Sequence, residues 1–453
     1  MAGIRCCAFD IMVIWVASGS VTGNASAAPV LLKESPTLGP TTRIQANLKG
    51  EGLFLQAPAP GTPKGQVPKP LTLKVEVRLD YFDRVLKRDG SGRPSRSARR
   101  IVRAGSAING EVRTFATAIR PAVAIVVAEA KPEGVLLFSP GGPFSQSELE
   151  LLEVPGDPLI LGELLSSKAV AAGDRWTLGE AAARALSSYD TILANSLEAS
   201  LETIDEASAQ LKLTGEVKGS RFGGEGTIKC EGFFTFDRKA GRVSKLTLER
   251  AETRRPGLVE EGLDVKSSLT LTRASAETPV ELTDDTLERI GTTANPKNLA
   301  ILFTAPDGKY TLIHDRAWHL YWDSPKLTVF KRIEGGRLIA QCNVTAGPSA
   351  GKGKHQDPNQ FREDIKKSLG SRFVQMIGVG EVEGDPSGGF RYKVGVQGRQ
   401  ENVGVVWYYY LIASPEGDQI LATFTLADSQ IQTFGAQDEA LIGSFRWKLG
   451  GGE

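Results

Sequence analysis

From Leu71 to Tyr81, apolar residues alternate one by one with charged or polar residues. Successive side chains of a β-strand point to opposite faces, so this period of two predicts a strand with one apolar and one solvated face. The segment Leu211–Val217 alternates in the same way. Strands of this kind build antiparallel sheets that face water on one side. The chain is therefore predicted to contain much one-sided antiparallel sheet.

A first group of such segments predicts a half-barrel-like β-rich domain with short helices at residues 71–275. Asp157 and Pro158 form an N-cap followed by a proline, which favours a helix start between Ser145 and Trp176. Helix formers continue over 178–194. The other strands are expected at Ile108–Ile119, Ala122–Ala130, Gly134–Phe138, Ser196–Ile204, Ala209–Lys218, Gly226–Phe236, Val243–Glu252 and Val265–Thr272.

The segment Val403–Ala413 is apolar at nearly every position, which is typical of a central strand covered on both faces. Asp357 and Pro358 open the clearest helix, whose apolar residues recur at every fourth position from Phe361. These features predict a C-terminal α/β/α sandwich with a central antiparallel sheet at 299–450, and an α+β class for the whole chain. Its other elements are expected at Leu299–Thr304, Tyr310–His314, Trp318–Trp322, Leu327–Ile333, Leu338–Thr345, Phe390–Val396 and Ile420–Leu426, with a last helix over Asp438–Phe445.

The N-terminus predicts export. Arg5, an apolar run over 11–17 and small residues ending near Ala28 match a secretory signal peptide, assigned to residues 1–28. Residues 29–70 are expected to be an extended segment with a Pro/Gly-rich connector, and 276–298 a linker. No later segment approaches ~18 apolar residues, so no transmembrane anchor is expected. We expect an exported protein that is located in the periplasm, or outside the cell or in the cell envelope.

Net charge and cysteine content limit the classes of function that this chain can have. The formal net charge is +1, which argues against a dedicated nucleic-acid binder. Only Cys230 and Cys342 follow the signal, and both lie in strand-like runs. Export permits a disulfide between them, although isolated cysteines far apart are more often buried as small apolar residues.

Four sequence motifs suggest a binding or catalytic site, and each has a simpler structural interpretation. His314 and His319 lack the spacing of a metal site and are interpreted as surface histidines flanking a turn. Gly347–Lys354 lacks the length and hydroxyl residue of a phosphate loop and is interpreted as a flexible insertion. The basic run Lys87–Arg103 is interpreted as a solvated hairpin loop, and the aromatic run Trp407–Tyr410 as core. The sequence therefore predicts no catalytic, cofactor-binding or metal-binding residue, no cofactor and no enzymatic activity.

Two resemblances add to this interpretation. Residues 299–446 resemble the PsbP-like family through Lys309–Ile313, Trp318–Phe330, Trp407–Gly417 and a closing helix with Leu441–Phe445. This resemblance implies a non-catalytic module that acts through partners. In residues 70–273, the strand pattern with interposed helices is similar to LolA/LolB-like half-barrel carriers, which implies an apolar face able to hold an acyl chain. The alternative is a face buried by the protein's own helices.

Three functional hypotheses follow. The leading one is an exported, non-enzymatic protein that binds an unknown protein partner or a ligand. The alternative is a carrier of a hydrophobic ligand, a lipid or lipoprotein, in the N-terminal β-rich domain. The third is a hydrolase without a recognisable motif, since convergent active sites need not carry one.

Overall fold

The computed structural model describes residues 28–34, 38–56, 68–110, 114–382 and 388–448. Nearly all of the predicted signal peptide and most of the predicted connector lie outside these ranges. About 55% of the described residues are in strands and 16% in helices. The predicted α+β class is therefore wrong, and the chain is mostly β. The helices are short connections between long antiparallel strands, and the longest, α5 (Pro358–Leu369), has 12 residues.

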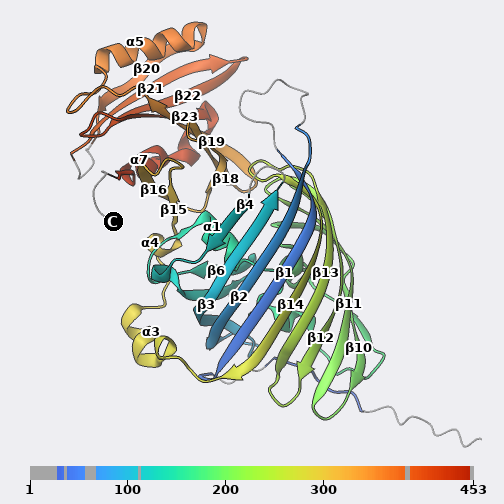
Figure 1. Cartoon of the computed structure of the whole chain (residues 1–453). Helices are drawn as coiled ribbons and strands as arrows, with labels where there is room; N and C mark the ends of the chain where they lie inside the picture. The colour runs from blue at the N-terminus through green and yellow to red at the C-terminus, as the bar shows by residue number, and fades with distance from the viewer. Residues whose placement is uncertain (1–27, 35–37, 57–67, 111–113, 383–387, 449–453) are drawn as a thin grey trace, which may run out of the picture.

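A thirteen-stranded sheet dominates the N-terminal part (Figure 1). Its order is β6-β5-β3-β2-β1-β14-β13-β12-β11-β10-β8, with β4 on β3 and β9 on β11, and its pairings are antiparallel. The strands are β1 (Thr41–Leu55), β2 (Leu71–Arg88), β3 (Pro94–Gly110), β4 (Thr114–Ala118), β5 (Ile125–Lys131), β6 (Gly134–Phe138), β8 (Arg175–Thr177), β9 (Thr191–Asn195), β10 (Glu198–Ile204), β11 (Ser208–Arg221), β12 (Gly224–Asp237), β13 (Arg242–Arg254) and β14 (Gly262–Ala276).

The alternation seen in the sequence separates the two faces of this sheet. On the face that we call the covered face, Ile44, Leu79 and Leu211 are buried. Leu161 and Leu186, from the segment between β6 and β9, join the same core. The short elements of this segment and of its flanks are η1 (Pro121–Val123), α1 (Gln146–Leu152), η2 (Leu161–Leu164) and α2 (Glu180–Ser187).

The basic run Lys87–Arg103 is not a solvated loop, as the sequence predicted. Strand β2 ends at Arg88 and β3 begins at Pro94, so only a short turn separates them. Arg99 lies in β3 with 3% of its surface exposed. Its guanidinium is paired with the carboxylates of Asp83 and Asp157, which provide the compensation that a buried charge requires.

A seven-stranded sheet dominates the C-terminal part, in the order β17-β18-β19-β23-β22-β21-β20. Both faces of β22 are buried, as the sequence predicted: α5 packs on one face, and α6 and α7 on the other. The elements are β17 (Trp318–Asp323), β18 (Leu327–Glu334), β19 (Arg337–Gly347), η4 (Gly370–Arg372), β20 (Phe373–Glu381), β21 (Phe390–Gln400), β22 (Val403–Ala413), β23 (Gln419–Ala427), η5 (Asp428–Gln430), α6 (Ile431–Phe434) and α7 (Gln437–Gly443).

A small four-stranded sheet joins the two parts. Strand β7 (Phe144–Ser145), which precedes α1, pairs in parallel with β15 (Ile301–Thr304) from the C-terminal half. Strands β16 (Tyr310–His314) and β24 (Arg446–Trp447) complete this sheet. The chain reaches it from β14 through η3 (Val280–Leu282), α3 (Asp284–Ile290) and α4 (Pro296–Leu299).

Several local predictions need correction. Asp157 does not start an α-helix: its Oδ1 accepts from the Leu159 amide, and only the 3₁₀ turn η2 follows. The insertion Gly347–Lys354 is tied to the turn after β22, because the Ala350 amide donates to the Gly417 carbonyl. His314 is not a surface residue, since only 5% of it is exposed. Strand β20, which was not predicted from the sequence, forms one edge of the seven-stranded sheet.

Candidate functional site

A cleft of about 870 Å³ lies where the two large sheets meet. Helix α1 and strand β15 supply one part of its wall, and β17 supplies another. The turn between β11 and β12 and the loop between β13 and β14 approach from the N-terminal sheet. Ligand sites commonly have volumes of ~300–1,000 Å³ and lie between domains or layers. The size and position of this cleft make it the candidate functional site.

Helix α1 is held firmly at the cleft. The Ser145 hydroxyl accepts from the Glu148 amide, and the Glu148 carboxylate accepts from the Ser145 amide. This reciprocal capping satisfies two amides at the start of the helix. Glu148 is buried and paired with Arg120 at 2.6 Å, which lowers the pKa of its carboxyl although burial alone would raise it. Strand β7 pairs with β15 and so attaches the start of helix α1 to that strand.

Phe222 reaches the cleft from a strained turn. Phe222 and Gly223 are the two central residues of the β11–β12 hairpin, and both have positive φ angles, +45° and +80°. Such a conformation suits glycine and costs a phenylalanine ~1–3 kcal/mol. Three contacts hold it: its amide donates to Asp190 Oδ2 at 2.7 Å, its carbonyl accepts from Leu258, and its ring lies 4.4 Å from that of His319. The strain thus places an aromatic ring on the cleft wall.

Apolar side chains form much of the cleft wall. They come from six different strands, helices and turns, so no single segment of the sequence carries the pattern. Phe115 of β4 is 56% exposed, whereas Phe303 of β15 is 7% exposed. The apolar lining consists of Phe115, Leu149, Phe222, Val259, Ile301, Leu302, Phe303, Trp318 and Leu320.

Two arginines line the cleft, and both already have partners. Arg221 Nε donates to Glu260 Oε1 at 2.7 Å, and Glu260 is also paired with Arg254. Arg316 Nε donates to the Leu299 carbonyl at 2.8 Å, and its Nη2 donates to the Leu137 carbonyl. Among the described residues, Arg221 therefore has a carboxylate partner, whereas Arg316 donates to main-chain carbonyls.

Four other carboxyls of the cleft form no ion pair among the described residues: Glu150, Glu153, Glu261 and Asp323. Glu150 accepts from Gln146 Nε2 at 2.7 Å, and Asp323 accepts from the Thr328 hydroxyl at 3.0 Å. Desolvation raises the pKa of all three glutamates and raises that of Asp323 to about 6. Glu150, Glu153 and Asp323 remain accessible to solvent inside the recess. The cleft thus presents unpaired carboxyls beside apolar walls.

Two basic side chains of the same region are also perturbed by burial. Desolvation lowers the pKa of His319 to about 4, so its ring is neutral at pH 7 and packs against Phe222 as an aromatic group. Desolvation lowers the pKa of Lys331 to about 8. Lys331 Nζ donates to the Leu258 carbonyl at 2.7 Å and lies over the Tyr321 ring. These contacts join β17 and β18 to the loops of the N-terminal sheet.

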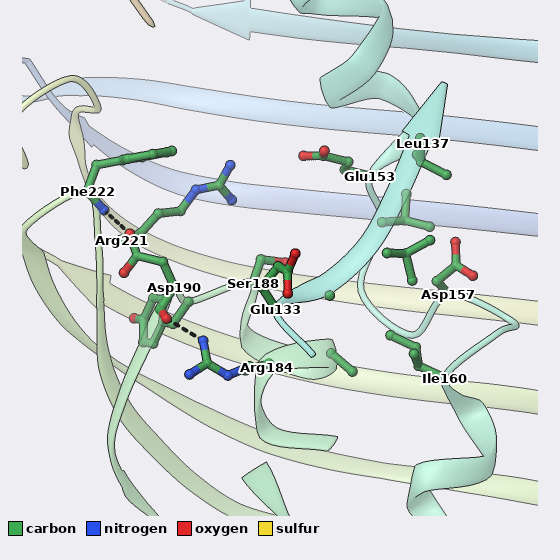
Figure 2. A pocket seen from close by; sticks show the side chains of 15 residues that line it. Glu133, Leu137, Glu153, Asp157, Ile160, Arg184, Ser188, Asp190, Arg221 and Phe222 are labelled. Carbon is green, nitrogen blue, oxygen red and sulfur yellow. Dashed lines mark hydrogen bonds between the residues drawn. The ribbon is translucent and has the colours of Figure 1, made fainter. Parts of the chain in front are cut away.

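A smaller hollow of about 220 Å³ lies on the other side of Glu153, Arg221 and Phe222, which line both spaces (Figure 2). Arg184 of α2 donates to the Asp190 carbonyl there. The hollow is bounded by β6, α2 and the β11–β12 turn.

The sequence named no site residue, and it placed neither the cleft nor its acidic lining. His314 and His319 lie in different strands, and no group of three potential metal ligands occurs among the described residues. The run Trp407–Tyr410 belongs to the core, as predicted. Cys230 and Cys342 are both buried and unpaired. The only local signal for the cleft was Phe222-Gly223, a hairpin turn with an aromatic residue where glycine or asparagine is usual.

Comparisons with known proteins yield weak structural similarity. No family model matches the chain, and no curated protein matches it. The PsbP protein CyanoP of Synechocystis sp. PCC 6803 is similar over 35% of this chain and 99% of its own, with 15% identity and a TM-score of 0.25. A Pseudomonas aeruginosa protein of unknown function, a putative regulator called PA94, is similar over 30% of this chain and 88% of its own, with 12% identity and a TM-score of 0.21.

A lipovitellin structure concerned with lipid–protein interactions is similar over 54% of this chain, with 8% identity and a TM-score of 0.30. The chain spans only 26% of that lipovitellin chain. The PsbP-like resemblance is thus supported only as a weak similarity over part of the chain, and these neighbours give no support to the LolA/LolB-like one. None of these similarities assigns a function. No helix among the described residues is long and apolar enough to cross a bilayer.

Proposed function

We propose that this chain is an exported, non-enzymatic binding protein of the cell envelope, and that its ligand occupies the cleft between the two large sheets. The observation that carries the proposal is the cleft itself, a space of about 870 Å³ with apolar and ionisable walls. Its walls come from both halves of the chain, joined through β7 and β15. A bound ligand would therefore contact both halves at once.

The alternative, a carrier of a hydrophobic ligand on the covered face, has less support. Leu161 and Leu186 pack there with Leu211 and Leu246 in one continuous core. A Cβ atom added at Gly156 would lie 2.8 Å from Leu246 and 3.7 Å from Leu161, so the segment touches the sheet closely. An acyl chain at this place would have to displace the chain's own residues.

The cleft is also the place where the third hypothesis, a hydrolase without a recognisable motif, can be tested. It brings ionisable side chains together in a recess, which is the arrangement that an active site needs. No residue pair on the described part of the chain supplies a hydroxyl or thiol nucleophile hydrogen-bonded to a histidine base there. We therefore propose binding rather than catalysis as the function.

Native mass spectrometry of the chain purified from the organism that makes it tests the proposal. We expect the wild-type chain to carry a bound small molecule. Thr304→Trp places an indole in the cleft from an exposed position of β15 and should abolish this adduct. Thr270→Trp, at an exposed position of β14, is the matched control and should retain it. A wild-type chain without adduct contradicts the proposal, and an adduct that survives Thr304→Trp favours the covered face.

A further inference from the structure

The cleft carries more acidic than basic side chains. Its lining includes two guanidinium groups, those of Arg221 and Arg316, and five carboxyls, those of Glu150, Glu153, Glu260, Glu261 and Asp323. Among the described residues, only Glu260 of these carboxyls forms an ion pair. Carboxylates form stronger hydrogen bonds with charged donors than with neutral ones. The lining of the cleft is therefore predominantly acidic, and a cationic ligand would balance its negative charge.

The aromatic side chains of the cleft favour the same kind of ligand independently of the carboxyls. The Phe115 ring is more than half exposed, and the Phe222 ring is held on the wall by a strained turn. The guanidinium of Arg221 already lies 5.9 Å from the Phe222 ring centroid, which is within the range of a cation–π contact. An exposed aromatic ring such as that of Phe115, beside carboxylates, is a favourable environment for an organic cation.

The apolar part of the cleft wall indicates what the uncharged part of the ligand is like. Leu149, Leu302 and Leu320 offer apolar contact from three elements that meet at the cleft. An anionic ligand would face four unpaired carboxyls against two guanidinium groups, and the guanidinium of Arg221 is already paired with Glu260. The walls therefore suit an apolar body joined to a positively charged group and disfavour an apolar body joined to an anion.

We propose that the ligand of the cleft is a small amphipathic organic cation, in which an amine or guanidinium group is attached to an apolar body. This inference rests on the proposed function, because it names the ligand class of the same cleft. The cationic group lies among Glu150, Glu261 and the aromatic rings, and the apolar body lies along the leucine side of the wall.

Isothermal titration calorimetry with three probes of equal chain length tests the inference: decylamine, decanoate and decanol, each below its aggregation concentration at pH 7.5. We expect decylamine to bind the full chain at least about tenfold more tightly than decanoate or decanol, as charge-assisted hydrogen bonds allow. Equal affinity for decylamine and decanoate, or stronger binding of decanoate, overturns the inference. So does failure of all three probes to bind.

Substitutions inside and outside the cleft test whether decylamine binds at the cleft carboxyls. The double substitution Glu150→Gln and Glu261→Gln should weaken decylamine about tenfold and leave decanol unchanged, because only the charge of the wall is altered. Glu288→Gln, at an exposed position of α3 outside the cleft, is the control and should change neither. Unchanged decylamine binding by the double variant overturns the inference. If decanoate then binds and Thr304→Trp blocks it, the cleft remains a binding site and only the charge of its ligand was misjudged.

Discussion

Arg99 of β3 donates two hydrogen bonds to Asp157, with Nη1 2.7 Å from Oδ2 and Nη2 2.6 Å from Oδ1. Its Nε donates a third to Asp83 Oδ1 at 3.0 Å. All three side chains are buried, and Asp157 belongs to the segment that packs on the covered face. This group of charges therefore ties the thirteen-stranded sheet to the chain that covers it.

Replacing Arg99 should be strongly destabilising. Arg99→Met leaves Asp83 and Asp157 buried without a cation, and breaking a buried pair in this way costs ~3–5 kcal/mol. Urea unfolding at pH 7 measures the loss. Arg43→Met is the matched control, because Arg43 is paired with Asp80 at the surface and such pairs contribute ~0–1 kcal/mol. Equal losses for the two variants would contradict the role given to Arg99.

Phe222 should serve ligand binding more than stability. Phe222→Asn keeps a residue that tolerates positive φ and removes the ring from the cleft wall. We expect decylamine affinity to fall about tenfold, because a partly desolvated cation–π contact and apolar contact are lost together. The free energy of unfolding should change little, since relief of the strained φ angle offsets the lost contact with His319. Calorimetry and urea unfolding on the same variant separate the two effects. A stability loss without an affinity loss would assign Phe222 a structural role.

Binding of a cation should strengthen as the pH rises. Desolvation raises the pKa of Asp323 to about 6, so this carboxyl is mostly neutral at pH 5 and mostly charged at pH 7. Decylamine stays protonated over this range, and its affinity should therefore increase from pH 5 to pH 7. Asp323→Asn should remove the part of this increase that is centred near pH 6. A wild-type affinity that does not depend on pH would count against an ionic contact in the cleft.

Lys331 should make stability depend on pH in the alkaline range. Desolvation lowers its pKa to about 8 from an ordinary value of 10.5, so between these values the unfolded chain binds more protons than the folded chain. Stability attributable to Lys331 therefore rises with pH from 8 to 10.5 and is constant outside this window. Lys331→Met should flatten the rise, as measured by urea unfolding at several pH values. Lys309, which is exposed, provides the control substitution Lys309→Met.

Much of the strand content was predictable, because it depends on local alternation. Leu71–Tyr81 and Leu211–Val217 lie within β2 and β11 with the predicted face buried. Asp357 caps α5 as predicted, since its Oδ1 accepts from the amides of Asn359 and Gln360. The class was misjudged because the predicted α/β/α sandwich and the short helices were taken to define it, whereas strands hold about 55% of the described residues.

The predictions that failed depend on contacts between residues that lie far apart in the sequence. The run around Arg99 carries too much charge to predict as buried strand unless Asp83 and Asp157 are known to lie beside it. Strand β20 was missed because Gly378 and Gly380 interrupt its pattern, and as an edge strand it has little apolar burial. The cleft is formed by residues from Phe115 to Asp323 that only the folded chain brings together.

The most direct test of the central claim is an experimental structure of the chain with its co-purified molecule bound. We expect density for the molecule between α1, β15 and the β11–β12 turn, with a positively charged group near Glu150 and Glu261 and an apolar body along Leu302 and Leu320. Density instead within the core of the covered face, around Leu161 and Leu211, or on the exposed face of the thirteen-stranded sheet would contradict it.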